Sequence, residues 1–277
     1  MTPGAALRRA GARLRGVRIL RRLHAGPVKT VWLLGRGDER WVMRVDEPLA
    51  AGFAPDRGTE FEVWQAAAAA GLAPQPLWLH RGPPAVLVAQ HAAGRAWRAA
   101  DLALPGRLEA LAALLRRVHQ ARLPGPPLGL GRAMAAHARR IGTPRARELA
   151  RSAGLWLDRA GSSGPPVLCH NDPIAANVVG LRRTVLIDWE YAARGDPLFD
   201  LAVIAQHHAL PGAQVARLAA AYHGGVGQVP RARLAANRVL YDHVLWLWLM
   251  ALAVATPLRG AQARQLAAVT RRLEEVR

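Results

Sequence analysis

One stretch of the chain, residues 167–203, constrains its fold more than any other. It reads VLCHNDPIAANVVGLRRTVLIDWEYAARGDPLFDLAV. A short apolar segment at 167–169 leads into His-Asn-Asp, and a second at 184–187 leads into another Asp. Such runs, bounded by polar and glycine-containing turns, predict two buried strands, which we expect to be neighbours. Their ends would then bring together Asp172, Asn177 and Asp188.

The chemistry of these three side chains is that of phosphoryl transfer. Asp172 can accept a proton from a hydroxyl, and Asn177 and Asp188 offer oxygen ligands to a hard cation such as Mg²⁺. The spacing His-x-Asp-x4-Asn, followed by a strand that ends in Asp, has the same division of roles as a kinase catalytic loop. A histidine near an aspartate is common in ordinary protein cores, but the full set favours a functional site.

At these residues the chain resembles the aminoglycoside phosphotransferase and choline kinase superfamily. The segments LIDWEYA and GDPLFDLA are most similar to bacterial choline kinases and thiamine kinases, because aminoglycoside enzymes usually have glycine in place of Glu190. The resemblance implies an α+β, two-lobed protein-kinase-like fold. Residues 1–92 would form a small, mostly β lobe with one helix that binds the nucleotide. Residues 93–277 would form a larger, mostly helical lobe for catalysis and substrate binding.

The first ninety residues read as short strands around one helix. Apolar runs separated by Gly and Pro lie at 17–23, 28–34, 40–45, 77–80 and 85–90. An alanine-rich segment at 59–70 predicts a helix, with Thr59 as its candidate N-cap. The densest basic segment, at 7–23, runs directly into the first strand. It is rich in arginine and free of acidic residues like a transit peptide but lacks the serine content, so we expect an amphipathic lead-in helix.

The resemblance also assigns roles to residues of this region. Arg44 takes the place of the phosphate-binding lysine of protein kinases, and Glu60 is its expected partner, with Glu62 as the alternative. Both could instead be ordinary surface charges. Lys29 ends the turn at 24–29, where the resemblance implies a phosphate-covering loop, and it is a candidate phosphate contact. A plain hairpin fits that turn nearly as well.

Helices predominate in the remaining sequence. They are predicted at 106–120, from Thr143 to near 161, at 196–206, 211–223, 230–255 and 262–276. His119 lies on an apolar helix face and is expected in the core. Asp196, followed by proline, is an expected helix cap. The resemblance implies that Asp200 braces the catalytic-loop backbone and that His170 supports the loop more than it takes part in the chemistry.

The expected activity is an ATP-dependent and Mg²⁺-dependent phosphotransferase acting on the hydroxyl of a small cationic alcohol such as choline, ethanolamine or thiamine. Glu190 and Tyr191 follow Asp188 closely, and Trp246 and Trp248 lie on an aromatic-rich helix. A carboxylate and aromatic faces attract a permanent cation. The alternatives are that Glu190 pairs with Arg194 or another arginine, and that the tryptophans only pack the core.

Other functions fit the sequence less well. An aminoglycoside site needs acidic residues to meet a polyamine, yet segment 201–273 contains only Asp242. A catalytically inactive kinase-fold binding protein usually loses part of the Asp, Asn, Asp set, which is intact here. The formal net charge of +19 suggests nucleic acid, but 37 of the 38 basic residues (all except Lys29) are scattered arginines, so nucleic-acid binding is not expected.

Two further features bear on location. The longest uncharged apolar run, at 244–255, is too short to span a bilayer and predicts a buried helix, so no membrane partner is expected. The single cysteine, Cys169, excludes an intramolecular disulfide and fits a reducing, cytoplasmic setting.

Overall fold

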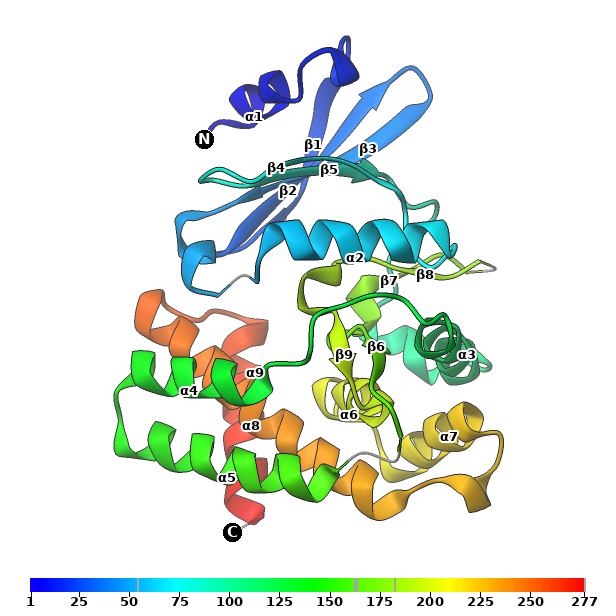
Figure 1. The fold of residues 1–277 in the computed structure, drawn as a ribbon, viewed down its shortest axis with the longest axis vertical. Coiled ribbons are helices and arrows are strands. Elements are labelled where there is room, and N and C mark those ends of the chain that lie inside the picture. The colour runs from blue at the N-terminus through cyan, green and yellow to red at the C-terminus, as the bar shows by residue number, and fades with distance from the viewer. Residues whose placement is uncertain (54, 162–163, 182, 277) are drawn as a thin grey trace. The chain divides into compact units, whose positions relative to one another are not determined.

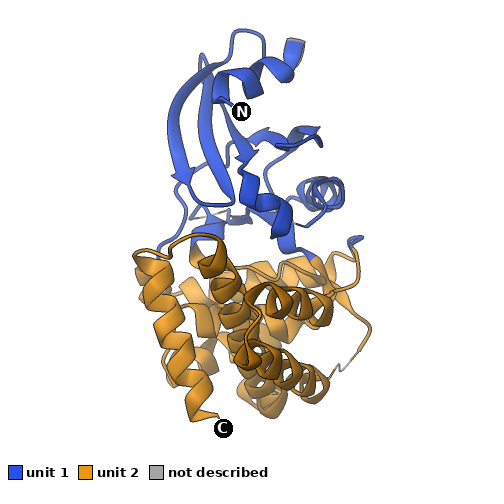
Figure 2. Cartoon of the chain, turned by 90° about the vertical axis from the view of Figure 1, so that its left-hand side faces the viewer, with its two compact units in different colours: residues 1–98, 123–125, 176–192 blue, residues 99–122, 126–175, 193–277 orange. Residues whose placement is uncertain are grey.

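The computed structural model describes residues 1–53, 55–161, 164–181 and 183–276. The chain divides into two compact units, coloured separately in Figure 2. Unit 1 comprises Met1–Arg98, Leu123–Gly125 and Ala176–Ala192, and unit 2 comprises Ala99–Arg122, Pro126–Ala175 and Ala193–Arg277. Unit 1 therefore includes Asn177 and Asp188. The division expected from the sequence, after residue 92, assigns both residues to the larger lobe.

Unit 1 is built on a five-stranded antiparallel sheet (Figure 1). Its strands are β1 (Arg18–Ala25), β2 (Lys29–Arg36), β3 (Glu39–Asp46), β4 (Pro76–His80) and β5 (Val86–Gln90). Their order across the sheet is β1-β2-β3-β5-β4. These strands coincide, within a residue or two, with the five apolar runs of the sequence.

The two faces of this sheet differ in chemistry. Apolar side chains of one face, including Met43 and Val45, pack against the helix α1 (Pro3–Arg9) and the 3₁₀ turn Gly11–Leu14. Because successive residues of a strand point to opposite faces, Arg44 points away from this core. The predicted lead-in helix is thus real but short, since β1 already begins at Arg18.

The helix of unit 1, α2 (Arg57–Ala69), begins earlier than the sequence suggested. Its N-cap is Asp56, whose Oδ1 accepts the backbone N–H of Thr59 at 2.7 Å. Thr59 was therefore wrongly predicted as the cap, because it is the third helical residue and is itself capped. Charged residues thus enter the first turn of the helix, and Arg57 and Glu60 are both buried there.

A short hairpin completes unit 1. Its strands, β7 (Val178–Val179) and β8 (Val185–Leu186), pair antiparallel. Trp97 holds the hairpin by donating its backbone N–H to Val178 O at 2.8 Å and its indole N–H to Gly180 O at 2.6 Å. Gly180 has φ +93°, and a Cβ there would lie 2.6 Å from the carbonyl oxygen of Arg183, so the turn requires glycine.

Unit 2 is mostly helical (Figure 1). Its helices are α3 (Arg107–Gln120), α4 (Leu130–Ile141), α5 (Pro144–Ala160), α6 (Pro197–His207), α7 (Gly212–His223), α8 (Arg231–Ala255) and α9 (Ala261–Glu275). The long helix α8 packs against α4, α5, α6 and α9 and forms the centre of the core. The helix α4 was not predicted from the sequence.

The strand that leads into His170 has a different partner from the one expected. Strand β6 (Val167–Cys169) pairs with β9 (Ala193–Gly195), whereas the strand before Asp188, β8, pairs with β7. The two strands predicted to be neighbours thus belong to separate two-stranded sheets. Three-residue and two-residue strands carry too little apolar pattern to specify their partners.

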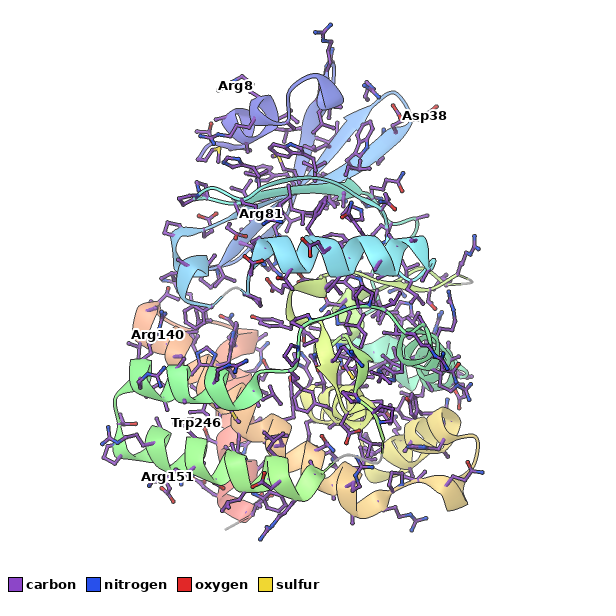
Figure 3. All side chains as sticks on the ribbon, viewed as in Figure 1. Arg8, Asp38, Arg81, Arg140, Arg151 and Trp246 are labelled. Atoms are coloured by element: carbon purple, nitrogen blue, oxygen red, sulfur yellow. The ribbon has the colours of Figure 1, made fainter. Side chains whose placement is uncertain are left out.

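Helix α8 is long and apolar enough to cross a membrane by length and composition alone. More than half of its most apolar window is buried, however, and the core helix of a water-soluble domain has the same properties. Trp246, on this helix, lies among the helices of unit 2 (Figure 3). The exposed arginines labelled in that figure are scattered: Arg8 lies on α1, Arg140 on α4 and Arg151 on α5, and Arg81 follows the end of β4.

Candidate active site

Seven charged side chains of unit 1 form one continuous cluster of ion pairs, which we call the buried charge cluster. Three cations and four carboxylates contribute to it: Lys29, Arg44, Arg57, Asp46, Glu60, Asp188 and Glu190. They come from β2, β3, the first turn of α2 and the residues that follow β8. Charges as buried as these remain ionised only when they are paired.

Arg44 and Glu60 form the centre of this cluster. Their side chains make two hydrogen bonds, Nη1 to Oε1 at 2.7 Å and Nη2 to Oε2 at 2.6 Å. Burial opposes the charge on Arg44, but Glu60 outweighs it and raises the pKa of the guanidinium. The alternative partner, Glu62, is exposed and lies 3.6 Å from Arg81. The structure thus contains the pair expected from the resemblance.

Arg57 is a member of the cluster that the sequence analysis missed. It donates to Asp46 Oδ2, Glu60 Oε2 and Glu190 Oε2, each at 2.8 Å. The helix was predicted to start at Thr59, so Arg57 was assigned to the loop before it. The Asp56 cap, with arginine three residues before Glu60, was the signal that could have revealed it.

Lys29 and Glu190 also belong to the cluster. The ammonium of Lys29 bonds to Asp188 Oδ2 and, at 2.8 Å, to Glu190 Oε1. Burial lowers the pKa of Lys29, but Asp188 and Glu190 together raise it above its ordinary value. Both oxygens of Glu190 are therefore engaged, and its arginine partner is Arg57. Arg194 instead donates to the backbone oxygen of Pro166.

The two predicted metal ligands lie at one end of the β7–β8 hairpin. Asn177 immediately precedes β7, and its carbonyl accepts the N–H of Ile187, the residue before Asp188, at 2.9 Å. Asp188 has a left-handed backbone with φ 66°. An amide and a carboxylate are oxygen donors of the type Mg²⁺ prefers, so this pair fits the ion implied by the resemblance.

The predicted catalytic loop, residues 170–175 (called the catalytic loop below), lies in unit 2 and is held by a buried carboxylate. Asp200 of α6 accepts the backbone N–H groups of His170 at 2.9 Å and Asn171 at 2.7 Å. Asn171 is in the left-handed region, with φ 62°. These bonds fix the backbone just before Asp172, which is half-buried. His170 is fully buried, and its supporting role in the loop stays a prediction.

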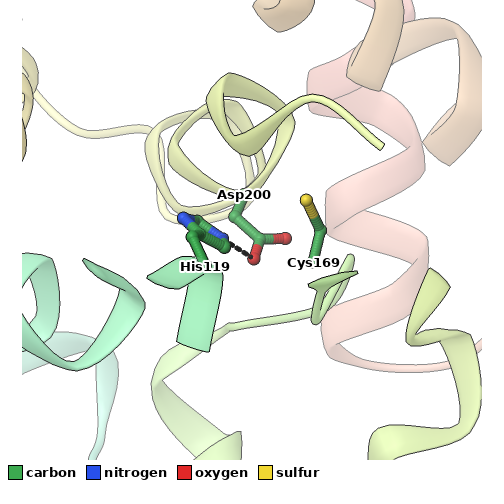
Figure 4. Close-up of side chains that lie close together, drawn as sticks. All are labelled: His119, Cys169 and Asp200. Atoms are coloured by element: carbon green, nitrogen blue, oxygen red, sulfur yellow. Dashed lines mark hydrogen bonds and ion pairs between the residues drawn. The ribbon is translucent and has the colours of Figure 1, made fainter. Parts of the chain in front are cut away.

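Figure 4 shows the surroundings of Asp200, where one polar atom each of His119, Cys169 and Asp200 lies within 4.8 Å of the others. By composition such a group could hold a metal. Burial and the charge of Asp200, however, raise the pKa of the Cys169 thiol, and only a thiolate is a good ligand. His119 bonds Asp200 at 3.0 Å and Tyr222 at 2.7 Å. We interpret the group as a core support for the loop.

The predicted substrate-binding aromatics are distributed over both units. Trp246 is buried in the core of unit 2 and donates its indole N–H to Thr270 at 3.1 Å. Trp248 is half-buried and packs against the same core. Tyr191, in unit 1, is half-buried. The contacts of Trp246 match the packing alternative, and the substrate roles of all three residues stay predictions.

Several solved structures have the same fold as this chain. A choline/ethanolamine kinase family protein from Mesorhizobium loti is 22% identical with a TM-score of 0.76, and the match covers 99% of this chain and 93% of that one. Choline kinase LicA from Streptococcus pneumoniae is 14% identical with a TM-score of 0.79, over 98% and 99%. An aminoglycoside-3'-phosphotransferase of type VIII is 22% identical with a TM-score of 0.63, over 87% and 98%.

These similarities confirm the kinase-like α+β fold that the resemblance implied. A sequence comparison with curated proteins finds no match. The profile of the phosphotransferase enzyme family, by contrast, matches residues 19–236, a range that contains the buried charge cluster, the hairpin and the catalytic loop. The chain therefore belongs to the phosphotransferase enzyme family.

Proposed function

We propose that this phosphotransferase transfers the γ-phosphoryl group of ATP to the hydroxyl of a small cationic alcohol of the choline, ethanolamine or thiamine type. The observation that carries the proposal is the catalytic loop, in which Asp200 fixes the backbone before Asp172 through two hydrogen bonds. Similar folds in complex with AMP, or with AMP-PNP and hygromycin B, support the use of an adenine nucleotide.

In this proposal the buried charge cluster serves the nucleotide. A guanidinium held by two hydrogen bonds to Glu60 is pre-organised, and Arg44 can present its remaining donors to phosphate oxygens. Lys29, the one lysine in the sequence, adds a second cation. Asn177 and Asp188 would hold Mg²⁺, which when bound neutralises charge on phosphate oxygens.

Asp172 is the proposed general base. As the substrate hydroxyl oxygen forms its bond to the γ-phosphorus, the bond from that phosphorus to the bridging oxygen breaks and its electron pair leaves with ADP. The hydroxyl proton passes to the Asp172 carboxylate. The chain contributes mainly orientation, because phosphoryl transfer needs little covalent help from the protein.

The charges of unit 2 favour a substrate with one positive charge over a polycationic aminoglycoside. Asp242 is the only acidic residue of segment 201–273. Its carboxylate already accepts from Arg272 at 2.5 Å and from Gln206 at 2.6 Å. It therefore has little capacity to attract a polyamine. The similarity to choline and ethanolamine kinases supports the same choice.

The test is ATP turnover by the purified protein over choline, ethanolamine, thiamine, homoserine and kanamycin. A neutral analogue of choline, in which carbon replaces the charged nitrogen, gives the matched comparison. We expect measurable kcat/KM for one of the cationic alcohols and a clearly lower value for the neutral analogue. Turnover of kanamycin alone would establish the aminoglycoside alternative. Absence of turnover with every compound would support an inactive binding protein.

A further inference from the structure

A second residue of unit 2 holds the catalytic loop, at the end of the loop away from the Asp200 bonds. The ring nitrogen Nε2 of His208 accepts the backbone N–H of Ala175 at 3.0 Å. His208 directly follows the last residue of α6, the helix whose first turn carries Asp200. Helix α6 and its C-cap residue thus contact the loop near both of its ends, at His170 and Asn171 through Asp200 and at Ala175 through His208.

The chemistry of His208 suits this role. Burial lowers the pKa of His208 to about 4, so its ring is neutral near pH 7. A neutral imidazole has one nitrogen with a free lone pair, and the backbone N–H of Ala175 can only be a donor, so Nε2 must be the acceptor. The ring is also packed against His207, with centroids 4.9 Å apart, which limits its rotation.

We propose, on the basis of the proposed function, that His208 is a positioning residue for phosphoryl transfer. Asp172 lies on a span of backbone fixed at 171 by Asp200 and at 175 by His208. A carboxylate within so short a span, tethered on both sides, keeps the placement that general-base catalysis needs. His208 acts through the backbone and contacts no reacting atom.

The experiment compares His208→Leu, which cannot accept the bond, with His208→Gln, whose side-chain oxygen can. His243→Leu is the matched control, because His243 is also a histidine of unit 2 with a pKa lowered by burial, but its ring bonds to Ser152 and to the backbone of Val239. Two quantities are measured: steady-state kinetics with MgATP, and amide hydrogen exchange of residues 170–175.

We expect His208→Leu to lower kcat by about 10- to 100-fold, as small misplacements of catalytic groups do, with little change in KM for MgATP. The exchange of the Ala175 amide should become faster in this variant. His208→Gln should restore most of both quantities. His243→Leu should leave loop exchange and kcat close to those of the wild type, even where it lowers stability.

Three results would overturn the inference. The first is amide exchange of the loop in His208→Leu at the wild-type rate. The second is a loss of kcat in that variant without faster exchange at Ala175. The third is an equal loss of kcat in His208→Gln and His208→Leu. The exchange measurement needs no substrate, so it also decides the inference if the wild type has no kinase activity. If His208→Leu does not fold, His208→Gln is compared with His208→Asn instead. The asparagine side chain is too short to reach the backbone N–H of Ala175, which the wild-type ring accepts at 3.0 Å.

Discussion

The guanidinium of Arg44, on β3, donates two parallel hydrogen bonds of 2.7 and 2.6 Å to the two carboxylate oxygens of Glu60, on α2. The Glu60 side chain has 0% exposure, and it accepts a third bond from Arg57 at 2.8 Å. One buried carboxylate therefore balances two guanidinium groups. Removing it would leave two buried cations with fewer partners, which is more costly than losing a surface ion pair.

Glu60→Ala should therefore lower the free energy of unfolding by about 3–5 kcal/mol, the range for breaking a buried pair. Glu62→Ala is the control on the same helix, since Glu62 is exposed; it should change stability by no more than about 0.5 kcal/mol. Urea denaturation of both variants measures the difference. Equal, small effects would mean that the Arg44–Glu60 pair contributes little.

Asp200→Ala should destabilise the protein and slow phosphoryl transfer together. The change leaves two backbone N–H groups, the buried one of His170 and the part-buried one of Asn171, without their acceptor, and a loss of this kind costs about 1–3 kcal/mol when the group is buried. Asp158→Ala, at an exposed position of α5, is the control and should be neutral. Thermal unfolding and kcat are the readouts. A stable variant with normal kcat would rule out a bracing role for Asp200.

Stability should fall as the pH is lowered from about 6.5 to about 4, partly because of His207 and His208. Burial lowers the pKa of each to about 4, so in this window the unfolded chain binds protons that the folded chain does not. The free energy of unfolding therefore rises with pH there, by up to about 1.4 kcal/mol per pH unit for each histidine. His208→Gln should reduce this slope, as followed by urea denaturation at several pH values. An unchanged slope would contradict the assignment.

Glu190→Gln distinguishes a structural from a substrate-binding role for that carboxylate. Lys29 and Arg57 engage both of its oxygens, so we expect lower stability and a preference for choline over its neutral analogue that changes less than about threefold, below 1 kcal/mol. The ratio of the two kcat/KM values measures the preference. A large loss of preference without loss of stability would show that Glu190 meets the cation directly.

Much of unit 1 was predictable because its signals are local. Alternation along β3 puts Arg44 on the face opposite to Met43 and Val45, and the start of a helix supplies Glu60. Pairings between distant segments were not predictable in the same way. Strands β6 and β9 pair with each other but are both very short. The hydrogen bond between His208 and Ala175 joins residues 33 positions apart.

Two other errors, the missed helix α4 and the missed residue Arg57, concern features that the sequence does indicate. Helix α4 is rich in alanine and arginine, with few large apolar residues, yet Gly142 ends it in a left-handed conformation that is a common helix stop. Arg57 was missed because the start of α2 was placed two residues late. One wrong cap thus removed a member of the buried charge cluster from the predicted site.

Transfer of phosphate by Asp172→Asn tests the central claim most directly. The protein is incubated with γ-labelled ATP, Mg²⁺ and the cationic alcohol that the wild type prefers, and labelled product is counted. We predict that the variant folds, is still stabilised thermally by MgATP, and loses phosphoryl transfer by roughly 10²–10⁴-fold, the contribution of a general base. Near-wild-type transfer by the folded variant would contradict the role of Asp172 and the account built on it.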